Sequence, residues 1–128
     1  MESLDMRPES MGPGIFLIVG YVATVAIEGP ILWYGLSASH SKIARLTAAF
    51  WLTACTYPIV VLVVPSIDLS QSRGGYLLVA ESFAVLGECL LFTVLFPVES
   101  LRSRLRDVSV VAIANLTSFL LGELWWRM

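Results

Sequence analysis

The chain has few of the residues that build metal and redox sites. Its 128 residues include one histidine and two cysteines. His40 lies in a polar segment, while Cys55 and Cys89 lie in separate apolar segments without CxxC spacing. Zinc sites need a cluster of such ligands, and haem needs an axial ligand. We therefore expect no zinc-type site and no cofactor, and we interpret the cysteines as buried reduced thiols.

Charge is also scarce. Charged residues make up 14% of the chain and the net charge is −2, whereas a soluble domain has about 25% charged residues. A nucleic-acid-binding protein needs a basic face, which this balance does not supply. With 57% hydrophobic residues, the composition is typical of an integral membrane protein, for which the bilayer is the first partner. Its length allows one domain, residues 1–128.

What the chain does have is four long apolar stretches. Each is long enough to cross a bilayer as a helix, which takes roughly 20 residues. Helices satisfy their own backbone hydrogen bonds, and the stretches lack the alternation of membrane strands. The sequence thus predicts an all-α protein, an up-down bundle of four transmembrane helices after a polar amino-terminal segment, residues 1–13. The predicted helices are Gly14–Leu36, Ile43–Val64, Tyr76–Phe96 and Val108–Trp126.

Basic residues indicate the orientation. The loops after the first and third stretches hold five of them, and the opposite side holds three. This excess favours a cytoplasmic position for the two loops. In the second loop, Leu101 and Leu105 alternate with arginines, which suggests a short interfacial segment. The five basic residues are Lys42, Arg45, Arg102, Arg104 and Arg106.

Four glutamates interrupt the apolar stretches: Glu28, Glu81, Glu88 and Glu123. Arg45, the third residue of the second stretch, is grouped with the preceding loop. Apart from it, the four stretches contain no Lys, Arg or His. A carboxylate in hydrocarbon costs about 3 kcal/mol, so such a group takes up a proton, binds a cation, faces water or pairs with a base. We expect any basic partner to come from another molecule.

Helix direction places three polar residues at one depth. Glu28 and Glu88 lie just past the middle of parallel helices, and Asn115 lies just before the middle of an antiparallel one. Glu81 and Tyr57 fall in the half nearer the chain ends. Two buried carboxyls at one depth are not expected to ionise together, because burial and mutual repulsion oppose it. We predict a proton or cation site made of Glu28, Glu88, Asn115, Glu81, Tyr57 and Thr24.

These polar residues also have structural interpretations. The glutamates can be protonated groups that hold helices together, Asn115 can bridge two helices, and Glu123, near a helix end, can reach lipid headgroups. Proline at positions 30 and 58 removes a helical hydrogen bond, which either shapes a kink or frees a carbonyl beside the site. A small-residue ridge, Ala114, Ser118 and Gly122, predicts close helix packing.

The chain contains a weak internal resemblance. Val25–Leu32 is similar to Val85–Phe92, and Leu52–Ala54 is similar to Leu116–Ser118. These matches are either chance similarities between apolar segments or the trace of two parallel hairpins related by an axis along the membrane normal.

The predicted site leads to two functions. A carboxyl pair that shares a proton can exchange it for a cation, which is the chemistry of proton-coupled transport and of cation pathways. Small multidrug exporters resemble the chain in size, helix count and a membrane-embedded glutamate, although their surrounding residue patterns are absent. The chain is short for a transport path, so we expect a homo-oligomer. Alternatively, the glutamates and the ridge dock a partner's membrane helices, as in an accessory or assembly subunit. No nucleophile and base pair lies within the spans, so we do not expect an enzyme.

Overall fold

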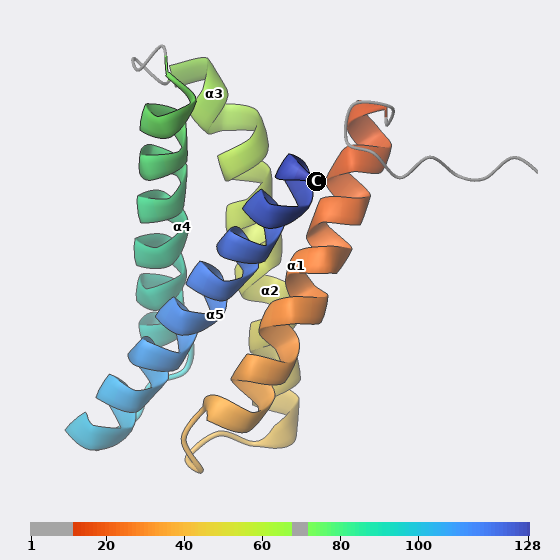
Figure 1. The fold of residues 1–128 in the computed structure, drawn as a ribbon. Coiled ribbons are helices and arrows are strands. Elements are labelled where there is room, and N and C mark those ends of the chain that lie inside the picture. Colours follow the sequence, from red (N-terminus) through yellow and green to blue (C-terminus); the bar gives the residue numbers. More distant parts are fainter. Residues whose placement is uncertain (1–11, 68–71) are drawn as a thin grey trace, which may run out of the picture.

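The computed structural model describes residues 12–67 and 72–128, and within these ranges it contains helices and no strand (Figure 1). Four helical segments are long and apolar enough to cross a membrane. The predicted all-α bundle is therefore confirmed. The second crossing consists of three consecutive elements, an α-helix that ends at Pro58, a π-helical turn and a short α-helix. The elements are α1 (Pro13–Gly35), α2 (Lys42–Pro58), the π-helix η2 (Ile59–Val63), α3 (Val64–Ile67), α4 (Arg73–Leu95) and α5 (Leu101–Arg127).

Serine side chains mark where three of the helices begin. Ser41, Ser72 and Ser100 each accept a hydrogen bond from the backbone N–H three residues later, at the starts of α2, α4 and α5. Such caps stabilise a helix by about 1 kcal/mol because they satisfy an amide that has no partner in the helix. The cap at Ser100 starts α5 seven residues before the predicted boundary at Val108.

This early start changes one expectation. The arginine-rich stretch predicted as a separate interfacial segment forms the first turns of α5, continuous with the membrane crossing. The other boundaries lie close to the predicted ones. Most of the predicted amino-terminal segment, residues 1–11, and part of the loop before α4, residues 68–71, lie outside the described residues.

The four crossings form a ring. α1 packs against α2 and α5, and α4 packs against the same two helices, so α1 and α4 lie on one diagonal. The α1–α2 and α4–α5 loops lie together at one end, called here the loop end (Figure 1). α3, the start of α1 and the carboxyl terminus lie at the opposite end, called here the terminal end.

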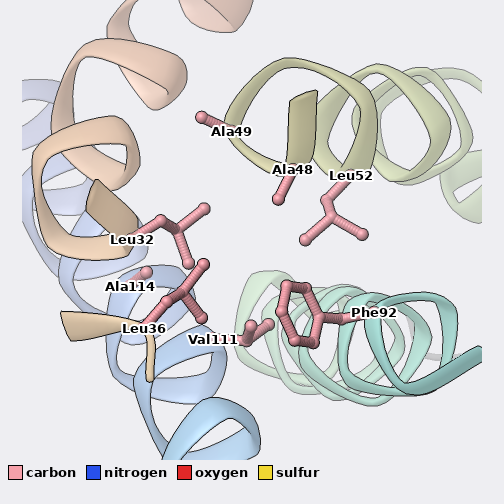
Figure 2. Close-up of a cluster of buried hydrophobic side chains, with 8 residues drawn as sticks. All are labelled: Leu32, Leu36, Ala48, Ala49, Leu52, Phe92, Val111 and Ala114. Carbon is pink, nitrogen blue, oxygen red and sulfur yellow. The ribbon is translucent and has the colours of Figure 1, made fainter. Parts of the chain in front are cut away.

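Apolar side chains fill the loop-end half of the bundle. They come from the ends of α1 and α4 and from the first halves of α2 and α5, and they point toward one another (Figure 2). Close packing of this kind holds helices together in lipid, where burying apolar surface gains little. The cluster comprises Leu32, Leu36, Ala48, Ala49, Leu52, Phe92, Val111 and Ala114.

The terminal-end half is built differently, because Pro58 has no N–H to donate. The helix widens after it into η2, where the N–H of Val64 bonds the carbonyl of Ile59. The hydroxyl of Tyr76 on α4 donates to the carbonyl of Val60 at 3.1 Å, which ties α4 to the widened turn. Pro58 thus shapes the wall of the bundle next to the polar residues described below.

Arginine side chains fasten the loop end. The guanidinium of Arg45 donates to the carbonyls of Trp33, Ser37 and His40, and Arg106 donates to the carbonyl of Gly35 at 2.8 Å. Cationic donors suit the carbonyl-rich end of a helix. Arg45, assigned to the loop on sequence grounds, therefore acts as a cap for the end of α1.

Candidate functional site: a carboxyl-lined cavity within the bundle

Glu28 joins three helices at the centre of the bundle. Its side chain is 1% exposed. The hydroxyl of Thr53 on α2 donates to Oε2 at 3.1 Å, and the hydroxyl of Ser118 on α5 donates to Oε1 at 2.6 Å. Each carboxyl oxygen thus receives one neutral donor, and the two donors come from the two helices that flank α1.

Glu88 on α4 has a matching environment and is 2% exposed. The hydroxyl of Thr56 on α2 donates to Oε1 at 2.6 Å, and the amide of Asn115 on α5 donates to Oε2 at 2.7 Å. The predicted proximity of Glu88 and Asn115 is therefore present as a direct hydrogen bond. Neutral donors satisfy a buried carboxyl oxygen but supply no opposite charge, so an ionised state of either glutamate is uncompensated by these partners.

Both carboxyls face one cavity, called here the central cavity, of about 140 Å³. Glu81, two turns before Glu88 on the same face of α4, lines it as well, and its Oε1 atom is buried without a hydrogen bond from the described part of the protein. A buried carboxyl oxygen without a donor is costly unless a water, a proton or a cation meets it. The six residues predicted as a site all line this cavity: Thr24, Glu28, Tyr57, Glu81, Glu88 and Asn115.

The bundle consists of two hairpins, α1 with α2 and α4 with α5. The glutamate of each hairpin accepts one hydrogen bond from its own hairpin and one from the other hairpin. Glu28 accepts from Thr53 in its own hairpin and from Ser118 in the other. Glu88 accepts from its own hairpin through Asn115 and from the other through Thr56. This exchange is what a pseudo-two-fold axis along the membrane normal produces.

Register along the helices agrees with this axis. Glu28 and Glu88 are 60 positions apart, as are the ends of the similar segments Val25–Leu32 and Val85–Phe92. On α2 and α5 the equivalent inward positions are 62 apart, which pairs Thr53 with Asn115 and Thr56 with Ser118. The resemblance noted between residues 52–54 and 116–118 is thus two positions out of the structural register, because it aligned Thr53 with an outward-facing threonine.

A second cavity, called here the terminal vestibule, adjoins the central one. It measures about 320 Å³, lies at the terminal end, and shares Thr24, Tyr57 and Ser118 with the central cavity. Glu123 and Arg73 line it and form an ion pair at 2.7 Å. The expectation that any basic partner comes from another molecule is therefore wrong for Glu123. Arg73 lies just outside the predicted third stretch, and the crossing of α4 and α5 brings it to Glu123.

The predicted packing ridge on α5 divides into different roles. Ala114 is buried in the apolar core, while Ser118 donates to Glu28. At Gly122 no atom of the described residues lies within 4 Å of the position that a Cβ would take, and the residue lines the terminal vestibule. Close packing against a neighbouring helix at Gly122 stays a prediction for contact with another molecule.

Several polar contacts carried no sequence signal. In a helix, a threonine such as Thr56 is expected to bond the carbonyl one turn back. The Thr56 hydroxyl does lie 3.1 Å from the carbonyl of Leu52. Asp107 is charged and adjoins an arginine-rich stretch, which is typical of a solvated helix start. In the structure Asp107 is 1% exposed and accepts from the Ser37 amide at 2.7 Å and the Ser37 hydroxyl at 3.0 Å. His40 Nε2 lies 2.7 Å from its Oδ2 atom.

Ser37, His40 and Asp107, called here the loop latch, do not form a nucleophilic triad. In a triad the histidine lies between the hydroxyl and the carboxylate, whereas here the serine and the histidine both contact the same carboxyl oxygen. His40 also packs against Phe92 with ring centroids 5.2 Å apart. The contacts fasten the α1–α2 loop to α5, which is a structural role.

Among residues 12–67 and 72–128, no group of three or more His, Cys, Asp or Glu side chains is placed to hold a metal ion. Comparison with protein-family models, with curated proteins and with solved structures finds no match to this chain.

Proposed function

We propose that this chain is a multi-pass membrane protein whose central carboxyls take part in proton- or cation-dependent transport or channel activity. One observation carries the proposal: Glu28 and Glu88 are both fully buried, face one cavity and are hydrogen-bonded by neutral donors. Purely structural polar groups in membrane helices are more often hydroxyls and amides, whereas ionisable groups mark proton and ion pathways.

The chemistry follows from the charge of the pair. Two carboxylates facing one small cavity repel each other in a medium of low dielectric constant, so the doubly ionised state needs a cation to neutralise it. When both carboxyls are protonated the pair is neutral, and its hydroxyl and amide partners suffice. A cation that enters therefore displaces a proton, and the unsatisfied Oε1 atom of Glu81 supplies a further acceptor in the same cavity.

The active form in this proposal is an oligomer. The central cavity of one chain is small, and the apolar core occupies the loop-end half of the same bundle. A continuous path across the membrane therefore needs either a rearranged bundle or a second copy. The two loops, with most of the basic residues, face the cytoplasm in this proposal, and the membrane is the cell membrane.

Infrared difference spectroscopy on the purified protein tests the carboxyl chemistry. Wild type is titrated with acid and with added monovalent or divalent cations, and Glu28→Gln and Glu88→Gln assign the carboxyl bands. We expect a band that loses its proton near neutral pH or when a cation is added, and we expect each Gln variant to remove it. Carboxyls that stay protonated throughout and ignore added ions would contradict an exchange site.

The side-chain series at the same positions separates function from structure. A protonated carboxyl and an amide have similar shape and both hydrogen-bond, so Gln preserves a structural role while Leu removes it. In the proposed function, Glu28→Gln and Glu88→Gln abolish pH-dependent flux in liposomes, and the purified variants keep their fold and self-assembly. Unchanged flux in both Gln variants, with unfolding in the Leu variants, would show that the glutamates only hold the bundle together.

An accessory or assembly subunit is the second candidate. It is favoured by the open space at Gly122, a wall residue of the terminal vestibule, where no atom of the described residues lies within 4 Å of the Cβ position and a partner's helix has room to pack. In that case Gly122→Leu releases a partner protein from pull-downs while the purified chain remains folded, and wild type supports no flux in liposomes.

A further inference from the structure

The two cavities form one route toward the central carboxyls. The central cavity and the terminal vestibule have three wall residues in common, Thr24, Tyr57 and Ser118. The vestibule is the larger of the two and is walled by aromatic side chains at the terminal end, among them Trp125 and Trp126. Aromatic rings of this kind lie at the interface between membrane and water. A solute that reaches the vestibule therefore needs to pass only these shared residues to reach Glu28, Glu81 and Glu88.

A pocket of about 350 Å³ lies between α1 and α2 in the loop-end half, but it shares no wall residue with the central cavity. Leu32, Leu36 and Phe92, each 2% exposed or less, fill the space between the helices in the loop-end half of the bundle (Figure 2). A pocket beside Asp107 at this end measures about 10 Å³, roughly the space of one water. The loop latch holds the α1–α2 loop over the same end. Core packing and the latch thus close this side.

The mouth at the terminal end is spanned by an ion pair. Arg73 at the start of α4 meets Glu123 near the end of α5 at 2.7 Å, and its guanidinium carbon lies 5.3 Å from the ring centroid of Trp126. The pair links α4 and α5, which are neighbours in the ring, and both of its side chains line the vestibule. The side chain of Arg73 is 51% exposed and that of Glu123 is 18% exposed. Pairs with such exposure hold weakly, so this closure opens at small cost.

The electrostatics of the mouth suit a gate. Arg73 places a positive charge in the wall of the route toward three carboxyls, and Glu123 offsets that charge when the two are paired. Arg127 lies 3.9 Å from the second oxygen of Glu123 and is available to it when Arg73 moves away. When the gate opens, Arg127 therefore replaces Arg73 as the basic partner of Glu123, and the Glu123 carboxylate is not left without a cation.

We infer that the central carboxyls communicate with one side of the membrane only, the terminal end, through the terminal vestibule, and that the Arg73–Glu123 pair gates this route. The inference rests on the proposed function for what travels along the route, whereas the route itself is a property of the cavities. It concerns regulation of the same site, because the gate sets how fast protons or cations reach Glu28 and Glu88.

Cysteine labelling tests the route without any assumption about activity. In a Cys55→Ser and Cys89→Ala background, Ala84→Cys places a thiol in the wall of the central cavity. Leu86→Cys, on the outward face at 71% exposure, serves as the lipid-facing control. A membrane-impermeant cationic methanethiosulfonate is added from one side or the other of sealed vesicles, with a carboxyl-terminal tag to report which side is the terminal end.

We expect Ala84→Cys to react with reagent on the tagged side and not with reagent on the loop side, and Leu86→Cys to react with neither. Adding Glu123→Gln or Arg73→Ala should speed the reaction about fivefold, the factor that corresponds to ~1 kcal/mol at the upper end for an exposed pair. The reversed pair, Arg73→Glu with Glu123→Arg, should return the rate toward that of the parent.

Reaction from the loop side, equal reaction from both sides, or a rate that no change at Arg73 or Glu123 alters would overturn the inference. One-sided, gate-dependent labelling together with absent flux and silent infrared bands would instead leave the route in place and reject the proposed function. Thermal unfolding of each variant, followed in parallel, identifies any change in rate that comes from loss of the fold.

Discussion

The hydroxyl of Tyr57 lies against the backbone of Gly20, so close that a Cβ at position 20 would overlap it. Gly20 is on α1 and Tyr57 on α2, one residue before Pro58. Tyr57 also forms part of the wall between the terminal vestibule and the central cavity. The missing side chain at position 20 thus makes room for the ring that separates the two cavities.

Replacing Gly20 with alanine should destabilise the bundle. Overpacking typically costs about 1–3 kcal/mol, which outweighs the gain of about 1 kcal/mol that alanine brings to a helix interior. Gly122→Ala is the matched control, because no atom lies within 4 Å of its Cβ position, and it should be neutral or slightly stabilising. The midpoint of thermal unfolding in detergent measures both. Equal midpoints for the two variants would show that Tyr57 does not occupy this position.

The hydroxyl that Ser118 donates to Glu28 should contribute measurably to stability. Ser118→Ala removes a 2.6 Å hydrogen bond to a buried carboxyl oxygen, and we expect a loss of about 1 kcal/mol in the free energy of unfolding. Ser109→Ala is the control on the same helix, since within the described residues the Ser109 hydroxyl bonds the carbonyl of Leu105 one turn back, at 2.7 Å, and no carboxyl. Chemical denaturation in mixed micelles compares the two. The contact would be unimportant if both alanine variants unfolded at the same denaturant concentration.

The loop latch should protect the α1–α2 loop from solvent. Asp107→Ala removes the acceptor of both the Ser37 amide and the Ser37 hydroxyl and also the contact to His40. Leaving a buried amide without an acceptor costs about 1–3 kcal/mol. Hydrogen–deuterium exchange of the peptide that spans residues 36–41 should therefore become faster than in wild type. Glu99→Gln, in the exposed second loop, is the control and should leave it unchanged. Persisting protection in Asp107→Ala would assign the loop's stability to the arginine contacts of Arg45 and Arg106.

Much of the central cavity could be predicted from the sequence, because the depth of a residue in the membrane follows from its position along its helix. Glu28, Glu88 and Asn115 share a depth in any up-down bundle with these spans, and charged or amide side chains in apolar segments turn toward one another and away from lipid. The same reasoning could not find Thr56 or Ser118 as partners of the carboxyls. Hydroxyls in helices commonly bond their own backbone, so their spacing does not separate those that face a site from those that do not.

The loop latch and the Arg73–Glu123 pair lay beyond sequence reasoning for another reason. Asp107 and Arg73 are charged residues near helix ends, where the sequence rule predicts contact with water or headgroups. Whether such a residue turns inward depends on which helix crosses which, and at what angle. α5 runs obliquely from beside the end of α4 to beside the start of α1 (Figure 1). Side chains of its first turns reach the α1–α2 loop, and Glu123 near its end reaches Arg73.

By itself the sequence determined the class of the protein, its four crossings, their antiparallel order and the layer in which acidic residues meet. These follow from local rules, because a backbone in lipid must form helices and an apolar run of given length must span. The tertiary structure alone decided which hydroxyls and amides satisfy each carboxyl, that the two hairpins exchange their partners, and that the central cavity adjoins the terminal vestibule. Those features depend on side chains from four helices packed at specific angles and registers. The hydrophobic pattern of the sequence specifies neither the angles nor the registers.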